Sequence, residues 1–197
     1  KHFDSPIEWT YTVAGGTDLI YSYMNAKSAN SYGLELDIKK SLDFIGLPNF
    51  SWAFNGALIK SLVNFEKGAK EANRPMQGQS PYLINTGIFY VNKQHQLNIA
   101  LLYNRIGKRL IGVGRSEGST SGNAANSKVP DSYEMPRDVI DLTASKVFGQ
   151  HWEVKFSIRD LLAQKVYYKQ FADVTYSNGQ TRKITEISRS FQPGQNI

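Results

Sequence analysis

The amino-acid sequence predicts an all-β fold: an antiparallel up-and-down β-barrel of the transmembrane type, here a partial barrel of consecutive β-hairpins. Three observations lead to this prediction. Apolar and polar side chains alternate with a period of two along most of the 197 residues, as in strands with two unlike faces. Short connections alternate with long polar ones. Aromatic residues make up 12% of the chain, and with 16 glycines they favour strands and turns over helices.

The alternation predicts a long first hairpin between residues 32 and 62. One face of its first strand carries Tyr32, Leu34, Leu36, Ile38 and Leu42, and the other face carries Glu35, Asp37, Lys39 and Ser41. A tight connection over residues 43–49 contains Gly46 and Pro48. The returning strand places these residues on one face: Phe50, Trp52, Phe54, Gly56, Leu58 and Leu62. Ser51, Ala53, Asn55, Ala57 and Ser61 fall on the other face.

Two more hairpins follow the polar stretch 66–80. Pro81 opens the second, which runs through residues 82–90, a short turn at 92–96 and a return over 97–106. Residues 107–136 form a predicted long loop rich in Gly, Ser and Asn. The third hairpin pairs residues 140–148 with 152–158 around a turn at 149–151.

The last part of the chain predicts one helical turn and one hairpin. The helical turn is expected over residues 160–164. The hairpin joins residues 166–176 and 181–191 around Ser177-Asn178-Gly179. An Asn-Gly pair is the strongest short hairpin signal, because both residues tolerate positive φ.

Strand length and the asymmetry of the connections favour a membrane barrel. Strands of about ten residues, short turns at one end and long loops at the other are typical of transmembrane β-barrels. Aromatic residues gather at predicted strand ends, where interfacial girdles lie: Tyr32, Trp52, Tyr82, Tyr90, Tyr103, Phe148 and Trp152. The polar alternates are expected to face a wet lumen: Glu35, Asp37, Asn55, Asn85, Asn98, Asn104, Asp141, Glu153, Lys155 and Arg159. A soluble barrel or sandwich with inverted faces has the same alternation and stays an alternative.

Composition excludes several other classes. The formal net charge is 23 − 17 = +6, and with 41% hydrophobic and 20% charged residues the chain is too apolar to be disordered. Without cysteine there is no disulfide scaffold, thiolate metal site or cysteine catalysis. Apolar runs reach only about five residues, against the roughly 20 that a spanning helix needs. The first residues do not resemble a signal peptide, and the Pro193-Gly194 turn near the end predicts a fragment of a longer chain.

No motif in the sequence predicts catalysis. Gly114-Arg115-Ser116-Glu117-Gly118 matches G-x-S-x-G, but the Ser/Thr/Gly-rich residues that follow cannot start the required helix. His2, His95 and His151 lie at a terminus and in two turns, so we expect no shared metal site. Asn49-Phe50-Ser51 fits a glycosylation sequon at a tight turn by chance. The sequence therefore predicts no enzyme, no catalytic residue, no cofactor and no metal site.

One cationic cluster is a candidate contact for anions. Arg105, Lys108, Arg109 and Arg115 are placed where they would meet the phosphates of a ligand or of lipopolysaccharide, although a solvated strand end and loop explains them better. Charges of both signs alternate along the strands, which argues against nucleic-acid binding. The pattern does not single out individual ligand-binding residues.

Five segments resemble the barrel of TonB-dependent outer-membrane receptors of the Bacteroidetes type. Ser31–Ile38 is similar to their "yG-x-E-x-x" strand near the end of the barrel. Arg74–Asn85 resembles an extracellular loop entering a strand, and Leu101–Arg109 the strand that follows. Val139–Thr143 and Ser157–Leu162 resemble the "vDl" strand and the "vrNLL" element, with Asp160 where Asn is usual. The order and spacing fit over residues 31–197, and the first 30 residues resemble the family weakly.

The resemblance implies a 22-stranded barrel with an N-terminal plug, of which residues 1–197 would supply the C-terminal segment, without the plug or the final strand. It implies TonB-dependent uptake of a large scarce nutrient (siderophore, cobalamin, glycan or similar) across the outer membrane of a Gram-negative bacterium. Expected partners are outer-membrane lipid and lipopolysaccharide, the TonB system through the plug, and the nutrient at the extracellular loops. Self-association through unpaired edge strands is also expected. The alternative function is a soluble ligand-binding or adhesion module.

Overall fold

The computed structural model describes residues 1–14, 18–67, 69, 71–114, 129–149 and 151–197. Antiparallel strands dominate these residues, and the one helical element among them is the short 3-10 turn η1, Asp43–Ile45. The prediction of an all-β antiparallel fold is confirmed. In the described part of the chain, no helix is long and apolar enough to cross a membrane.

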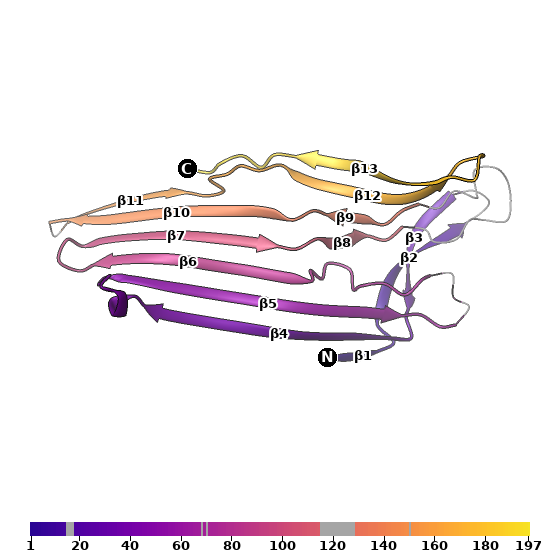
Figure 1. Ribbon diagram of the computed structural model, residues 1–197, viewed down its shortest axis with the longest axis horizontal. Coiled ribbons are helices and arrows are strands. Elements are labelled where there is room, and N and C mark those ends of the chain that lie inside the picture. Colours follow the sequence, from indigo (N-terminus) through magenta and orange to yellow (C-terminus); the bar gives the residue numbers. More distant parts are fainter. Residues whose placement is uncertain (15–17, 68, 70, 115–128, 150) are drawn as a thin grey trace.

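A seven-stranded antiparallel sheet forms most of the molecule (Figure 1). In spatial order its strands are β1 (His2–Asp4), β4 (Ser28–Ser41), β5 (Phe50–Asn64), β6 (Tyr82–Asn92), β7 (Leu97–Ile106), β10 (Arg137–Phe148) and β11 (Trp152–Ile158). The three hairpins expected from the alternation, β4–β5, β6–β7 and β10–β11, are all present. Within the described residues the order runs from β1 to β11 without returning, so the sheet is open.

Two smaller sheets lie towards the end of the molecule that is on the right in Figure 1. The first has the order β13 (Thr181–Phe191), β12 (Val166–Thr175), β9 (Ser132–Glu134) and β8 (Arg109–Gly112). Figure 1 shows β8 and β9 continuing the lines of β7 and β10. The second is the hairpin of β2 (Ile7–Ala14) and β3 (Asp18–Asn25), which was not among the predicted hairpins.

Short turns and long connections lie at opposite ends of the seven-stranded sheet, as predicted. The turns after β4, β6 and β10 lie at one end of the sheet, on the left in Figure 1, and the connection from β5 to β6 lies at the other end. Two expectations were wrong. Residues 107–136 are not simply a loop, since they contain β8 and β9. Residues 160–164 form no helical turn, because Asp160 and Ala163 have φ values of 55° and 44°, which a right-handed helix excludes.

Register divides the six long strands β4, β5, β6, β7, β10 and β11 into two faces, because paired residues point to the same side. We call the first the apolar face; its hydrophobic side chains include Leu34, Leu36, Leu58, Ile84, Ile88, Ile99, Leu101, Leu142, Val154 and Phe156. The second is the polar face. It carries nine of the polar residues that were predicted to share one side of the sheet: Glu35, Asp37, Asn55, Asn85, Asn98, Asn104, Asp141, Glu153 and Lys155. Arg159 lies beyond β11, in an isolated bridge to Asn196.

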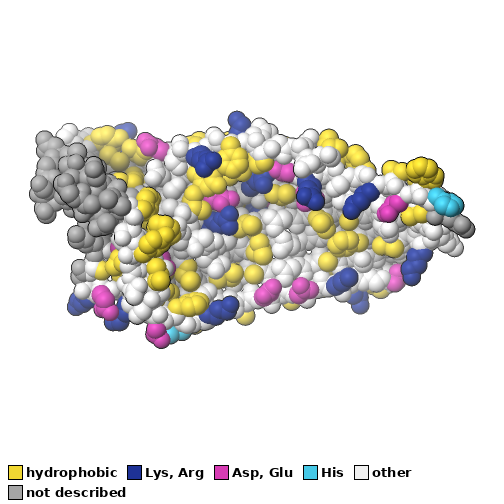
Figure 2. Space-filling view, turned by 180° about the vertical axis from the view of Figure 1, so that it is seen from behind, with side chains coloured by type: hydrophobic (Ala, Val, Ile, Leu, Met, Phe, Trp, Pro, Cys, Tyr) yellow, Lys and Arg dark blue, Asp and Glu magenta, His cyan; other side chains and the backbone are white. Residues whose placement is uncertain are grey.

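The buried core is small and lies under the β2–β3 hairpin. Its centre is Ala26, Ala29, Val63 and Phe65, with Met24 and Met76 packed against them. Because Ala29 pairs with Val63 in the register that defines the polar face, this core lies on that face. The face seen in Figure 2 mixes scattered hydrophobic side chains with charged ones and shows no continuous apolar band.

The apolar face, in contrast, is uncovered. Leu34 is 79% exposed, Leu58 65%, Trp152 75% and Val154 58%. The accessible surface of the whole molecule is 13713 Å², whereas a soluble monomer of this mass is expected to expose about 9,300 Å². Together with these exposed side chains, the excess indicates that the apolar face has no covering layer among the described residues.

Candidate functional site

A row of asparagines crosses the polar face. Asn55, Asn85 and Asn104 lie on neighbouring strands and are paired directly in register. Asn104 donates to Asn85 (2.5 Å), Asn85 donates to Asn55 (3.4 Å), and Asn55 donates to the Glu35 carboxylate (3.0 Å). All three amides therefore donate towards β4, where carboxylates end the row.

A cavity of about 280 Å³ opens beside this row. Its walls combine the apolar side chains Phe89 and Leu102 with the polar residues Asp37, Asn85 and Asp141. Few polar groups on an otherwise apolar wall are typical of small-molecule sites, although this cavity is slightly below their usual ~300 Å³ lower limit. The arrangement can accept hydrogen bonds from a ligand or from water, and we assign no covalent chemistry to it.

Two aromatic belts border the apolar face. Tyr32, Tyr82 and Tyr103 lie towards the long connections, and Trp52, Tyr90, Phe148 and Trp152 lie towards the short turns. Tyr82 and Tyr90 share this face on β6, and eight residues span about 27 Å at ~3.4 Å per residue. That spacing matches the ~25 Å apolar band of outer-membrane barrels.

Charged side chains on the apolar face stay near its margins. Lys40 pairs in register with Trp52, Lys60 lies beyond Tyr82, and Lys146 reaches over the Phe148 ring at 5.1 Å. Long lysine side chains can place the amine at an interface while the stem stays in apolar surroundings. The band between the belts on β4–β7 carries no charged side chain among the described residues.

The predicted cationic cluster is largely neutralised. Arg105 pairs with Asp138 (2.5 Å), and Arg109 with Glu134 (2.8 Å). Lys108 lies over the Tyr133 ring at 4.7 Å. Arg115 lies outside the described residues. Because the two arginines already have carboxylate partners, the cluster is not a ready site for phosphate, which favours its interpretation as a strand end.

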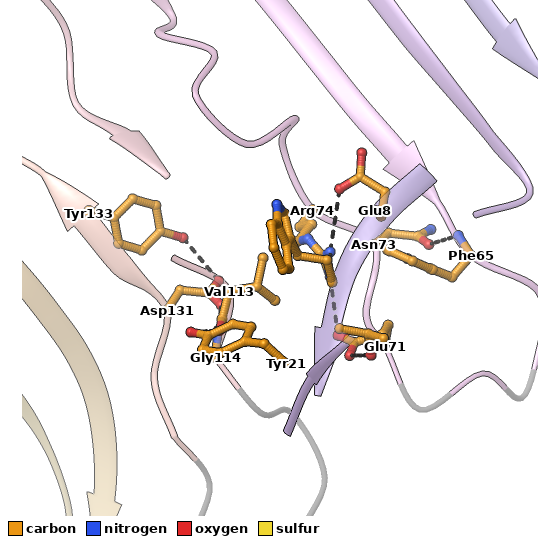
Figure 3. A network of polar contacts seen from close by, with 12 residues as sticks. Glu8, Tyr21, Phe65, Glu71, Asn73, Arg74, Val113, Gly114, Asp131 and Tyr133 are labelled. Atoms are coloured by element: carbon orange, nitrogen blue, oxygen red, sulfur yellow. Dashed lines mark hydrogen bonds and ion pairs between the residues drawn. The ribbon is translucent and has the colours of Figure 1, made fainter. Parts of the chain in front are cut away.

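A buried ion network holds the β2–β3 hairpin to the sheet (Figure 3). The Arg74 guanidinium donates to Glu71 (3.1 Å), to Glu8 (3.4 Å) and to the Trp9 carbonyl (2.8 Å). The three charged side chains are at most 9% exposed. Arg74 also lies over the Phe65 ring at 4.8 Å. One residue of the β5–β6 connection thus contacts two acids and the backbone of the hairpin.

Weaker contacts extend this network to the connection between β8 and β9. The Tyr21 hydroxyl donates to the Val113 carbonyl at 3.5 Å. The Gly114 N–H donates to Asp131 at 2.7 Å, and Asp131 also accepts from the Tyr133 hydroxyl at 3.4 Å. Figure 3 shows these groups beside the Arg74 network. The hairpin and both long connections are therefore joined at one end of the sheet.

Glu8 predicts a measurable pH dependence. Burial raises the pKa of the Glu8 carboxyl above its ordinary value of 4.5, and the nearby Arg74 opposes this only in part. The native state then holds the Glu8 proton more tightly than the unfolded state, so the contribution of Glu8 to the free energy of unfolding is greatest below pH 4.5 and is lost as pH rises through its folded-state pKa, a negative slope against pH. Glu71 accepts hydrogen bonds from the same Arg74 guanidinium (3.1 Å) and from the Thr10 hydroxyl (2.5 Å).

We expect Glu8→Gln to remove this negative slope of unfolding free energy against pH in the acid range. Urea unfolding at a series of pH values measures it. Glu66→Gln is the control. Glu66 is exposed, and its ion pair with Lys27, at 3.8 Å, is long and solvent-exposed. An unchanged slope in Glu8→Gln would show that another group titrates.

The remaining candidate motifs do not form a site. His2 contacts Asn30 and Asp4, whereas His95 and His151 lie in the short turns. Asn49 lies in the β4–β5 turn with φ 74°. The G-x-S-x-G motif spans residues 114–118, of which residues 115–118, including Ser116, lie outside the described part. Within the described part, no group of three or more His, Asp or Glu side chains is arranged to hold a metal ion.

No family model, curated protein or solved structure matches the chain. Function therefore has to be inferred from the two faces of the sheet and from the network at its end. Sequence reasoning identified the polar residues of the sheet but missed the Arg74 network. Glu8 and Glu71 are more than 60 residues apart, and no local pattern connects them.

Proposed function

We propose that this chain is the C-terminal barrel portion of a TonB-dependent outer-membrane receptor, which takes up a large scarce nutrient across the outer membrane of a Gram-negative bacterium. The observation that carries the proposal is the exposed apolar face bordered by aromatic belts. In lipid this face is stable, whereas in water its exposure costs roughly 25 cal/mol per Å². The choice of this family rests on the resemblance of residues 31–197 to receptor barrels.

Between neighbouring long strands the backbone meets the main demand that lipid makes, whereas the outer edges of β4 and β11 would need further strands. Between neighbouring long strands the N–H and C=O groups form continuous antiparallel ladders, for example over fourteen pairs between β4 and β5. Lipid tolerates a spanning sheet only when such groups are paired. The belts would lie at the two membrane surfaces, in contact with lipid headgroups and lipopolysaccharide.

The polar face and the long connections have separate roles in this proposal. The asparagine row and its cavity would line the lumen. The plug would lie in this lumen, and the nutrient would pass through it. The connections joined by Arg74 would lie outside the cell and meet the nutrient first. Coupling to TonB would act through the plug, and the barrel itself would do no covalent chemistry.

Light scattering coupled to gel filtration, with and without detergent, tests the membrane part of the proposal. We expect the purified chain to need detergent to stay dispersed, because nothing in the described structure covers the apolar face. A compact, detergent-free monomer would contradict this and support the soluble ligand-binding or adhesion module instead.

Uptake measurements test the receptor part. Deleting the gene is expected to abolish the uptake of one nutrient among siderophores, cobalamin and glycans, and an uncoupler of the inner membrane should produce the same loss in the parent strain. Uptake that is lost on deletion but insensitive to the uncoupler would contradict TonB dependence.

A further inference from the structure

A hollow interrupts the apolar face at Gly56. Of the three glycines in the six long strands, Gly33 and Gly87 belong to the polar face, and Gly56 lies on the apolar face. Gly56 is paired with Leu36 on one side and with Ile84 on the other. Without a side chain at this position, the face is hollowed between these two neighbours over a volume of about 490 Å³.

The walls of this hollow are apolar. The side chains of the apolar face that line it are Leu34, Leu36, Phe54, Leu58, Tyr82 and Ile84. Glu35, Ala57 and Leu83 also border it, but the register turns their side chains to the polar face. The Phe54 ring leans over Gly56, since a Cβ atom there would lie 2.8 Å from two of its carbons. The hollow therefore suits a hydrocarbon group.

The hollow lies in the half of the apolar band that is nearer the long connections. Its rim on that side is Tyr82, a belt residue, and Gly56 is two residues from Leu58, the partner of Tyr82. Two strand residues span about 7 Å, and the four residues from Gly56 to Trp52 of the opposite belt span about 14 Å. In the proposed orientation the hollow faces the outer leaflet.

A cation and a hydroxyl lie at the belt end of the hollow. Lys60 follows Leu58 on the same face, is exposed, and forms no ion pair among the described residues. The Tyr82 hydroxyl accepts from Arg105 at 3.3 Å, and its own O–H has no acceptor in the described part of the chain. Arg105 itself is neutralised by Asp138. Lys60 and Tyr82 are thus available to donate to an anion such as a phosphate.

We propose that the hollow binds one phosphate-bearing lipid of the outer leaflet, with an acyl chain over Gly56 and the phosphate at Lys60 and the Tyr82 hydroxyl. The proposal rests on the proposed function for the membrane orientation, and deepens it by naming a specific lipid site on the outer wall. A lipid joins the two chemistries that the site presents in this order, an apolar chain below the belt and an anion at it. The site is built by β4, β5 and β6 alone.

Native mass spectrometry of the chain in detergent, titrated with phosphatidylglycerol, tests the acyl-chain half. We expect one tightly held lipid per chain. Gly56→Leu fills the hollow and is expected to weaken this binding roughly tenfold or more. Gly56→Ala should weaken it less, because its methyl group displaces only the Phe54 ring. Ala144→Leu, which introduces the same side chain on the apolar face of β10, is the matched control and should bind as the parent does.

Lys60→Gln tests the phosphate half. It is expected to weaken the binding of phosphatidylglycerol about fivefold and to leave the binding of diacylglycerol with the same acyl chains unchanged. Lys40→Gln is the control, since Lys40 lies on the same face but at the opposite belt, paired with Trp52. Equal losses for the two lysine variants would contradict a phosphate contact at Lys60.

Equal lipid binding by the parent chain and by Gly56→Leu, with the strand content of the variant kept in circular dichroism, would overturn the proposal. A loss of the same size in Ala144→Leu would also overturn it. If Gly56→Leu does not fold, unchanged binding in Gly56→Ala and Lys60→Gln has the same meaning. Because the detergent requirement is measured on the parent chain, these results would leave the proposed function standing.

Discussion

Replacing Arg74 with alanine is expected to lower the free energy of unfolding by about 3–5 kcal/mol, because it leaves two buried carboxylates without their cation. Glu8 and Glu71 are as buried as Arg74 itself, so water cannot take its place without opening the end of the sheet. The variant also loses the hydrogen bond to the Trp9 carbonyl. The first consequence should be release of the β2–β3 hairpin.

Urea unfolding in detergent, followed by tryptophan fluorescence, measures the Arg74 effect. Lys183→Ala is the matched control, since Lys183 is an exposed cation on β13 and should change stability by less than about 0.5 kcal/mol. Adding Glu8→Gln and Glu71→Gln to Arg74→Ala should recover part of the loss, because the orphaned charges disappear. A loss below about 1 kcal/mol for Arg74→Ala would show that the network does not hold the hairpin.

Leu101→Arg is expected to cost up to about 2–4 kcal/mol when the chain is folded in lipid vesicles, because the arginine would lie inside the apolar band, two residues from the belt residue Tyr103. Leu101 lies on the apolar face of β7, between Ile99 and Tyr103, and is paired with Ile88 and Leu142. Its side chain is 44% exposed, so the arginine would find lipid rather than a packed core.

The neighbouring Leu102 is a close internal control. It has the same residue type, lies on the same strand and is 41% exposed, but it belongs to the polar face. In vesicles Leu102→Arg should be tolerated within about 1 kcal/mol, since its side chain would meet a wet lumen. In a soluble protein the two substitutions would have similar effects, so equal losses would contradict the membrane orientation.

The hairpins could be predicted from the sequence because apolar and polar side chains alternate over most of their length. Between Tyr32 and Leu62, and between Tyr82 and Ile106, a period of two leaves one arrangement of faces, and the register follows from short turns. The Asn178-Gly179 turn was equally local, with Gly179 at φ 77°. Where the strand pattern and the turn residues agree, the local sequence is enough to predict the hairpin, and tertiary contacts change little.

The remaining elements depend on contacts that are distant in sequence. The β2–β3 hairpin lies in a stretch whose alternation was not recognised, and Arg74 connects it to the sheet from more than 60 residues away. β8 and β9 are only four and three residues long, and they exist because β12 pairs with β9. Asp160 adopts positive φ while its carboxylate contacts Arg137, a tertiary contact that outweighs the local helical signal.

The candidate site was predicted in part. Alternation placed Asn55, Asn85 and Asn104 on one face, but their direct opposition depends on the register of β5, β6 and β7. The carboxylate partners of the cationic cluster could not be predicted, because Asp138 and Glu134, which pair with Arg105 and Arg109, lie 33 and 25 residues away. Closure of the sheet into a barrel stays a prediction.

Spin-label accessibility along β7 tests most directly whether the apolar face meets lipid. Single cysteines at residues 98–103, labelled in a chain that has no other cysteine, would be measured in vesicles with oxygen and with a water-soluble nickel complex. We expect period-two alternation, with residues 99, 101 and 103 exposed to oxygen and residues 98, 100 and 102 to nickel. Uniform accessibility to nickel, or the opposite phase, would contradict a membrane-spanning sheet.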